Sequence, residues 1–124
     1  MSLKVLVCGG RKFDDAMTLG SWLGGIHKKA GISLLIQGGA PGADYMAARF
    51  AEWAGIPVST FKADWSLGKR AGPMRNAKML REAKPDLVVA FEGGAGTADM
   101  VEKAKAAGVR VIEAYKIFNP EVLS

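Results

Sequence analysis

The sequence predicts a three-layer α/β fold built on one open parallel sheet of about five strands. Five short runs rich in Val, Ile, Leu or Phe alternate with stretches that have helical spacing, and several of these runs are apolar at every position. Parallel strands that helices cover on both faces have this pattern. Since crossovers between parallel strands are right-handed, the simplest topology is a Rossmann-like sheet with the order 3-2-1-4-5.

The predicted strands are all short and end in polar or glycine-containing segments. They run from Leu3 to Cys8, Ile32 to Gln37, Pro57 to Phe61, Asp86 to Phe91 and Val109 to Ala114.

The first two predicted helices connect the first three strands. Asp14 or Asp15 caps the first helix and Gly31 ends it. The second helix begins near Gly42 or Ala43 and ends at Gly55. Helical periodicity predicts that seven large side chains of these helices point to the core: Met17, Trp22, Leu23, Ile26, Met46, Phe50 and Trp53.

The last two predicted helices flank the fourth strand. The third runs from about Pro73 to Ala83, with Pro73 in its first turn. The fourth runs from about Thr97 to Ala107, and Gly108 ends it.

Composition limits the class of protein. A chain of 124 residues with 49% hydrophobic content fits one domain, residues 1–124, with its own core. One cysteine and one histidine exclude a disulfide framework and a usual zinc site, so we predict no metal site. No apolar run approaches ~18 residues, so we expect a cytoplasmic protein without a membrane span. A net charge of +5 favours an anionic partner.

Three glycine clusters follow predicted strands, in "VCGGRK", "IQGGAPGAD" and "FEGGAGTAD". Ligands of open parallel sheets bind beyond the carboxyl ends of the strands, where helix N-termini and bare backbone suit phosphate. Tight turns without a ligand are the alternative, and neither G-x-G-x-x-G nor a P-loop occurs. We predict one ligand-binding rim made of Gly9, Gly10, Arg11, Gly38, Gly39, Gly42, Asp44, Gly93, Gly94, Gly96 and Thr97.

Two of these rim residues have a second interpretation. Thr97 either caps its helix or offers a hydroxyl to a phosphate. Asp44 either binds the ligand or caps the second helix.

A basic segment from Phe61 to Lys84 contributes further candidates. Arg75 and Asn76 fall on the first turn of the third predicted helix, where Arg75 can bind a phosphate bidentately and Asn76 can contact a sugar or base edge. Trp65 either stacks on a base or packs half-buried. A solvated helix face is expected for Lys78, Arg81 and Lys84.

The segments "GGAPGAD", "AGPMRNAKM" and "FEGGAGTADM", in this order, resemble the SLOG superfamily, and most of all its YspA-type, cpYpsA-related branch. The resemblance extends from the first strand to about Ile112. It implies a Rossmann-like domain that binds a nucleotide or nucleotide-derived ligand. It also implies a homodimer or a higher homo-oligomer.

A more distant resemblance connects the chain to the LOG-type phosphoribohydrolases, which cleave the N-glycosidic bond of nucleoside 5′-monophosphates. Arg75 matches their arginine, and the loop from Gly93 to Thr97 matches their "GGxGTxxE" loop, but Met100 occupies the glutamate position. A thioether cannot stabilise a cationic sugar as a carboxylate does. Asp99 is adjacent but ~100° away around the helix. Arg75 and Asp99 are the catalytic candidates that this resemblance implies, with Asp44 as a substitute carboxylate.

Three functions are therefore open. The first is binding of a phosphorylated nucleotide-like ligand as a sensor or carrier, with Mg²⁺ as a companion of the ligand. The second is hydrolysis of a nucleotide or nucleotide-sugar N-glycosidic bond. The third is binding of single-stranded nucleic acid, which the basic segment suggests. We favour the first, because the glycine rim suits small phosphates.

Overall fold

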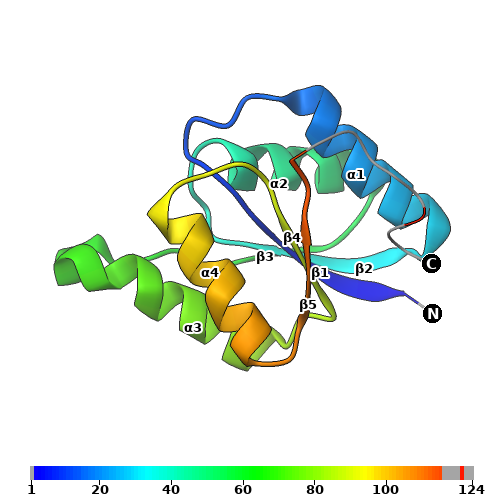
Figure 1. Ribbon diagram of the computed structural model, residues 1–124. Coiled ribbons are helices and arrows are strands. Elements are labelled where there is room, and N and C mark those ends of the chain that lie inside the picture. Colours follow the sequence, from blue (N-terminus) through cyan, green and yellow to red (C-terminus); the bar gives the residue numbers. More distant parts are fainter. Residues whose placement is uncertain (1, 116–120, 122–124) are drawn as a thin grey trace.

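The computed structural model describes residues 2–115 and residue 121. Its five strands form one parallel sheet in the order β3-β2-β1-β4-β5, which confirms the predicted fold class and strand order. Figure 1 shows α1 and α2 on one face of this sheet and α3 and α4 on the other. The strands are β1 (Leu3–Cys8), β2 (Ile32–Gln37), β3 (Val58–Thr60), β4 (Leu87–Ala90) and β5 (Arg110–Glu113). The helices are α1 (Ala16–Lys29), α2 (Ala43–Ala54), α3 (Ala71–Ala83), α4 (Ala95–Ala106) and a short 3-10 helix, η1 (Trp65–Arg70).

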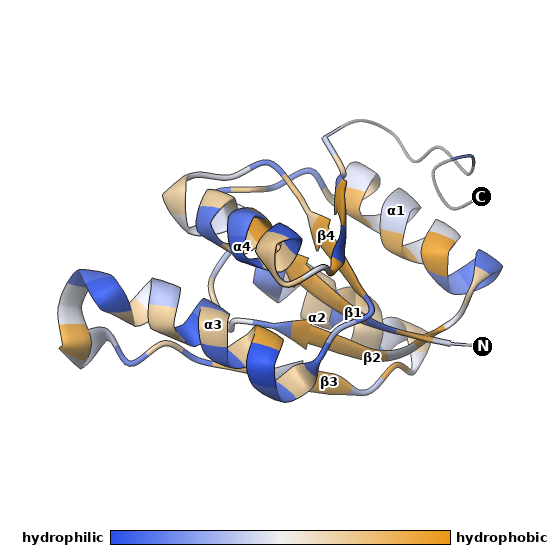
Figure 2. Ribbon diagram, turned by 60° about the horizontal axis from the view of Figure 1, so that its bottom comes forward, coloured by the Kyte–Doolittle hydropathy of each residue, from blue (hydrophilic) through white to orange (hydrophobic). Residues whose placement is uncertain are grey.

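The central strands supply side chains to a core on each face of the sheet. Along β1, Val5 and Val7 pack with α1 and α2, whereas Leu6 and Cys8 pack with α3 and α4. The alternation follows from the two-residue period of a strand. Both faces are covered, so β1, β2 and β4 are largely hydrophobic, as Figure 2 shows. This explains why the predicted runs had no polar face.

Helix α1 has the predicted cap and most of the predicted core face. The Asp15 carboxylate accepts a hydrogen bond from the Thr18 backbone N–H at 3.0 Å, as an N-cap residue does. The buried face consists of Leu19, Trp22, Leu23 and Ile26. The prediction for Met17 was wrong, because this side chain lies on the opposite side of the helix and is 80% exposed.

Helix α2 faces the sheet with small side chains. Ala43, Ala47 and Ala51 are fully buried, while Met46 and Phe50 pack at the margin of the same core. Trp53 was predicted to point inward and is instead 83% exposed. The alanines allow the helix to lie close to the sheet, and Trp53 falls beyond the face that they define.

Helices α3 and α4 both begin two residues earlier than predicted. Helix α3 continues directly from η1, so Arg75 and Asn76 lie in its second turn rather than its first. Helix α4 has Gly94 as its N-cap, and the buried Thr97 is its third residue, so Thr97 does not cap it. Within the described residues, no helix is long and apolar enough to cross a membrane.

Candidate functional site

The candidate site lies where the strand order reverses. From β1 the chain continues to β2 and β3 on one side of the sheet, and β4 and β5 lie on the other side. The loops that follow two such neighbouring strands diverge, which leaves a crevice at the carboxyl ends. A cavity of about 690 Å³ occupies this edge, and the loops after β1, β2 and β4 together with α3 line it.

Some of the glycines are required because the loops pack on one another through bare backbone. A Cβ atom on Gly42 would lie 2.2 Å from the Gly10 carbonyl oxygen, and one on Gly93 would lie 2.6 Å from the Gly10 nitrogen. The Gly10 N–H also donates to the Glu92 carbonyl at 2.9 Å. Gly10, Gly42 and Gly93 thus have a structural reason that needs no ligand.

Packing between loops does not explain why residues Gly94 and Gly96 are glycines. Both line the cavity, and a Cβ atom on either one would meet no atom within 4 Å beyond its neighbours in the chain. Neither is among the glycines with positive φ. They leave bare backbone at the start of α4, where helix N–H groups lack partners within the helix.

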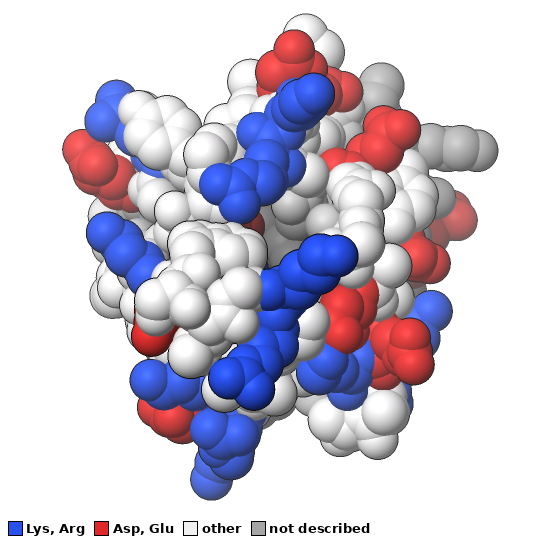
Figure 3. Space-filling model, turned by 90° about the vertical axis from the view of Figure 1, so that its left-hand side faces the viewer, with Lys and Arg blue, Asp and Glu red and all other residues white. Residues whose placement is uncertain are grey.

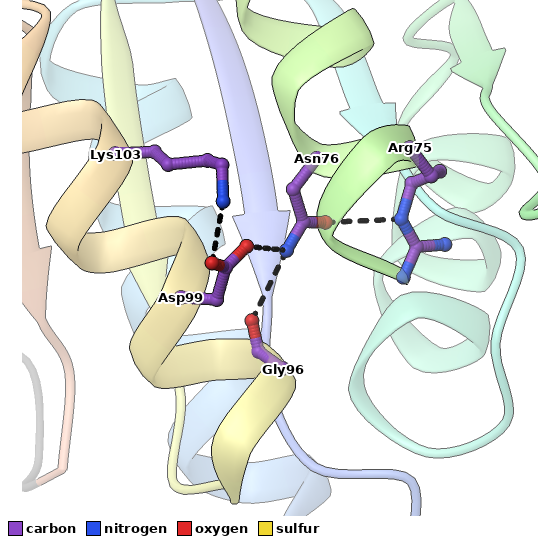
Figure 4. Close-up of polar contacts among 5 residues, drawn as sticks. All are labelled: Arg75, Asn76, Gly96, Asp99 and Lys103. Carbon is purple, nitrogen blue, oxygen red and sulfur yellow. Dashed lines mark hydrogen bonds and ion pairs between the residues drawn. The ribbon is translucent and has the colours of Figure 1, made fainter. Parts of the chain in front are cut away.

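Arg75 and Asn76 form a connected set of hydrogen bonds that is drawn in part in Figure 4. Arg75 Nη1 donates to the Gly38 carbonyl at 2.8 Å, and Arg75 Nε donates to Asn76 Oδ1 at 3.0 Å. Asn76 Nδ2 donates to the Gly96 carbonyl at 3.2 Å and to Asp99 Oδ2 at 3.0 Å. The Asn76 amide therefore joins α3 to the first turns of α4, and Arg75 is held at the cavity wall.

Asp99 is not among the residues that line the cavity. Its carboxylate accepts hydrogen bonds from Asn76 and from the Lys103 ammonium group. Burial acts to raise the pKa of Asp99, but these hydrogen bonds and the Lys103 charge outweigh it and lower the pKa.

Asp44 does line the cavity and is 6% exposed. Its Oδ2 atom accepts hydrogen bonds from the backbone N–H groups of Gly38 at 3.1 Å and Ala40 at 3.2 Å. Helix α2 has Gly42 as its N-cap and no side-chain cap, so the capping interpretation of Asp44 was wrong. Burial raises the pKa of Asp44, although the Ala40 and Gly38 hydrogen bonds and the charges of Arg75 and Arg11 act in the opposite direction.

An exposed aromatic ring and basic side chains lie at the mouth of the cavity. The Arg11 guanidinium lies 5.6 Å from the centre of the Trp65 ring, and Trp65 is 55% exposed. Lys12 lines the cavity beside Arg11. Figure 3, which views the carboxyl edge of the sheet, shows Lys and Arg side chains on both sides of a hollow.

The structure brings most of the predicted site residues together around this cavity. It is lined by Gly9, Gly10, Arg11, Asp44, Trp65, Arg75, Asn76, Gly93, Gly94, Gly96 and Thr97. Four predicted residues do not line it: Gly38, Gly39, Gly42 and Asp99. Gly38 holds Arg75 through its carbonyl, and Gly39 and Gly42 turn the β2–α2 loop with positive φ.

The predicted site residues did not include six polar residues of the wall: Lys12, Asp14, Asp15, Thr18, Glu92 and Tyr115. Lys12 follows the first glycine loop directly, so the loop prediction should have extended by one residue. Tyr115 follows β5, whose carboxyl end lies on the same edge of the sheet, which is the signal that would have found it.

Cys8 lines the cavity but does not present a reactive thiolate. Burial, with a smaller contribution from the Asp44 charge, raises the pKa of Cys8 to about 12. A thiol with this pKa is protonated at neutral pH, so Cys8 acts as a small buried hydrophobe. Within the described residues, no cluster of three or more His, Cys, Asp or Glu side chains is arranged to hold a metal ion.

The fold and the crevice define an open α/β protein with a candidate ligand site at the switch point of its sheet. The sequence profile of the YspA, cpYpsA-related SLOG family matches residues 3–68, more than half of the chain, and the chain belongs to this family. The resemblance seen in the sequence is thereby confirmed. The matched region includes the first two glycine loops and ends before Arg75 and the third loop.

A structural comparison agrees with the fold. The crystal structure of a UDP-N-acetylglucosamine 2-epimerase is similar over 90% of this chain, with a TM-score of 0.57 and 15% sequence identity. This chain spans 32% of the epimerase chain, so the likeness concerns about a third of that enzyme and shows the fold alone. No curated protein matches this chain.

Proposed function

We propose that this protein binds a nucleotide or a nucleotide-derived phosphorylated ligand in the cavity, as a sensor or carrier. A phosphate group would lie against the backbone from Gly94 to Thr97. The observation that carries the proposal is the bare backbone of Gly94 and Gly96, which the packing of the protein does not require. A ligand that approaches the backbone closely supplies the missing reason for glycine at these positions.

The cavity wall carries charges of both signs, because Asp14, Asp15, Asp44 and Glu92 line it as well as three basic residues. The positive groups are the ones that support an anionic ligand. Arg11, Lys12 and Arg75 contribute positive side chains, and the N-terminus of α4 contributes unpaired N–H groups and a positive partial charge. A volume of about 690 Å³ lies within the range of pockets that hold small molecules, which is roughly 300–1,000 Å³. Family membership is consistent with a nucleotide-related ligand.

Replacement of Gly94 tests the proposal. We expect wild-type protein to be stabilised against heat by at least one member of a panel of nucleoside mono-, di- and triphosphates, ADP-ribose, NAD and cyclic nucleotides, with and without Mg²⁺. The stabilisation is ~2.7 kcal/mol at 100 times the dissociation constant. Gly94→Val should fold normally, because its Cβ meets no atom within 4 Å, and should lose this shift.

Gly20→Val is the matched control, since Gly20 is equally uncrowded but lies outside the cavity lining on α1. It should retain the ligand-induced shift. An unchanged shift in Gly94→Val would contradict the placement of the phosphate, and a flat wild-type result across the panel would contradict the ligand class.

Hydrolysis of an N-glycosidic bond is a second candidate, and the buried Asp44 carboxylate in the cavity is the observation that favours it. Met100, at the position of the expected glutamate, is fully buried in the core between the sheet and α3 and α4. Asp99 is turned towards Asn76 and Lys103. Asp44 is the buried carboxylate of the wall, which Asp14, Asp15 and Glu92 also line. Release of free base or ribose phosphate from a bound nucleotide would establish catalysis, and its loss in Asp44→Asn would assign it to Asp44.

A further inference from the structure

One oxygen atom of Asp44 has no partner among the residues that the structure describes. Both loop N–H groups donate to Oδ2, and no described residue donates to Oδ1. Among the described residues, no buried side-chain oxygen or nitrogen lacks a hydrogen-bond partner, so Oδ1 keeps contact with open space. Because Asp44 is 6% exposed and lines the cavity, this open space is the cavity itself.

The surroundings of Asp44 restrict what Oδ1 can bind. The positive charges of Arg75 and Arg11 act on Asp44, which disfavours a ligand ammonium group or a metal ion beside it. Apart from these arginines, the residues that interact with Asp44 are Gly38, Ala40 and Cys8, and none of them offers an aromatic ring on which a base could stack. The exposed Trp65 ring, over which Arg11 lies, is at the mouth and provides such a surface. A neutral hydroxyl donor therefore fits Oδ1 best.

We infer that Asp44 Oδ1 accepts a hydrogen bond from a sugar hydroxyl of the ligand and makes the site selective for ribose phosphates over deoxyribose phosphates. This inference rests on the proposed function, because it requires the phosphate to lie at the start of α4. A buried carboxylate discriminates strongly between the two kinds of sugar, since a ligand without the hydroxyl leaves the carboxylate oxygen without a hydrogen-bond partner and shielded from water.

The test uses four probes without a base: inorganic phosphate, ribose 5-phosphate, 2-deoxyribose 5-phosphate and 3-deoxyribose 5-phosphate. Chemical-shift titration of the whole chain measures each affinity. We expect wild-type protein to prefer ribose 5-phosphate to at least one deoxy analogue by about tenfold to a hundredfold.

Asp44→Asn is the variant that keeps the loop intact. Its amide oxygen must face the N–H groups of Gly38 and Ala40, which places its NH₂ group in the cavity. The charged acceptor is lost, so the sugar preference should fall about fivefold. Binding of inorganic phosphate should not weaken. In Asp44→Ala, circular dichroism checks folding, and the folded variant should have no sugar preference.

The outcomes separate this inference from the proposed function. Equal binding of all three sugar phosphates to wild-type protein overturns the role of Asp44 and leaves the phosphate site standing. A wild-type preference that persists unchanged in Asp44→Asn also overturns it. If none of the four probes binds, this inference is overturned, and the nucleotide panel decides the proposed function separately.

Discussion

At the scale of single residues, five glycines of the loops around the cavity divide into two kinds that the sequence does not distinguish. Gly10, Gly42 and Gly93 allow loops to touch, and a methyl group on Gly42 or Gly93 would collide with backbone. Gly94 and Gly96 face open space. Only the second kind points to a ligand, because the first is explained by packing.

Gly42→Ala should destabilise the protein far more than Gly55→Ala. Both residues have positive φ, +80° and +72°, which costs an L-residue about 1–2 kcal/mol. A methyl group on Gly55 meets nothing, whereas one on Gly42 lies 2.2 Å from a backbone oxygen. We expect the Gly42 variant to lose at least about 3 kcal/mol, measured by urea unfolding. Equal losses would mean that the loop relaxes freely.

Asp44 should make stability depend on pH. Its folded pKa is raised above the ordinary value of 3.8, mainly by burial, in surroundings that include Arg75, Arg11 and Cys8. The folded state therefore binds this proton more tightly than the unfolded state does. The contribution is fully present below pH 3.8 and is lost as the pH rises through the folded pKa.

Asp44→Asn removes this titrating group and is therefore the reference against which the pH dependence of the wild type is measured. The stability of the wild type relative to the Asn variant should decline as the pH rises from 3.8 through the raised pKa, as thermal unfolding at each pH would report. A difference that stays constant with pH would show that Asp44 has an ordinary pKa in the folded protein.

At the scale of elements, α3 and α4 are joined by one side chain. Asn76 is 3% exposed, and its amide group bonds to Arg75, to the Gly96 carbonyl and to Asp99. The bond to Gly96 ties α3 to the first turn of α4, which carries the bare backbone of the site. The geometry of the proposed phosphate site thus depends on a residue whose two amide donors are both used within the protein.

Asn76→Ala should lower the free energy of unfolding by about 2–3 kcal/mol, because it leaves several polar groups without partners. It should also weaken ligand binding, since the start of α4 loses its tether. Lys78→Ala on the same helix is the control and should change neither quantity, because Lys78 is exposed and outside the cavity lining. Urea unfolding and the nucleotide-induced thermal shift measure the two effects. A stable variant with weakened binding would assign Asn76 to the site alone.

At the scale of the whole molecule, the net charge of +5 and the basic side chains of the carboxyl edge attract polyanions. Extended binding of single-stranded nucleic acid needs a series of aromatic platforms. Of the described residues that line this cavity, Trp65 and Tyr115 have exposed aromatic rings, and two rings do not form a series. The architecture therefore favours binding of one small phosphorylated ligand over binding of a nucleic-acid strand. The family resemblance implies a homo-oligomer, which stays a prediction that sedimentation velocity can test.

A competition experiment decides between a small phosphorylated ligand and single-stranded nucleic acid. We expect a labelled single-stranded oligonucleotide to bind weakly, with an affinity that falls steeply with salt, and to be displaced by the small nucleotide that stabilises the protein. Fluorescence anisotropy at several salt concentrations measures both. Tight oligonucleotide binding that the nucleotide does not displace would favour the nucleic-acid function instead.

The sequence by itself determined the sheet, its strand order and the edge at which the glycine loops meet. These follow from the periodicity of hydrophobic residues, from the glycines that end strands and helices, and from the handedness of crossovers. All three are local properties of the sequence or general properties of protein chains. The tertiary structure decided the exposure of Met17 and Trp53, the loop-closing role of Asp44 and the distinction between crowded and open glycines. Arg75 meets Gly38 across 37 positions and Asn76 meets Asp99 across 23. Such contacts depend on how separate elements pack, and spacing along the chain does not encode them.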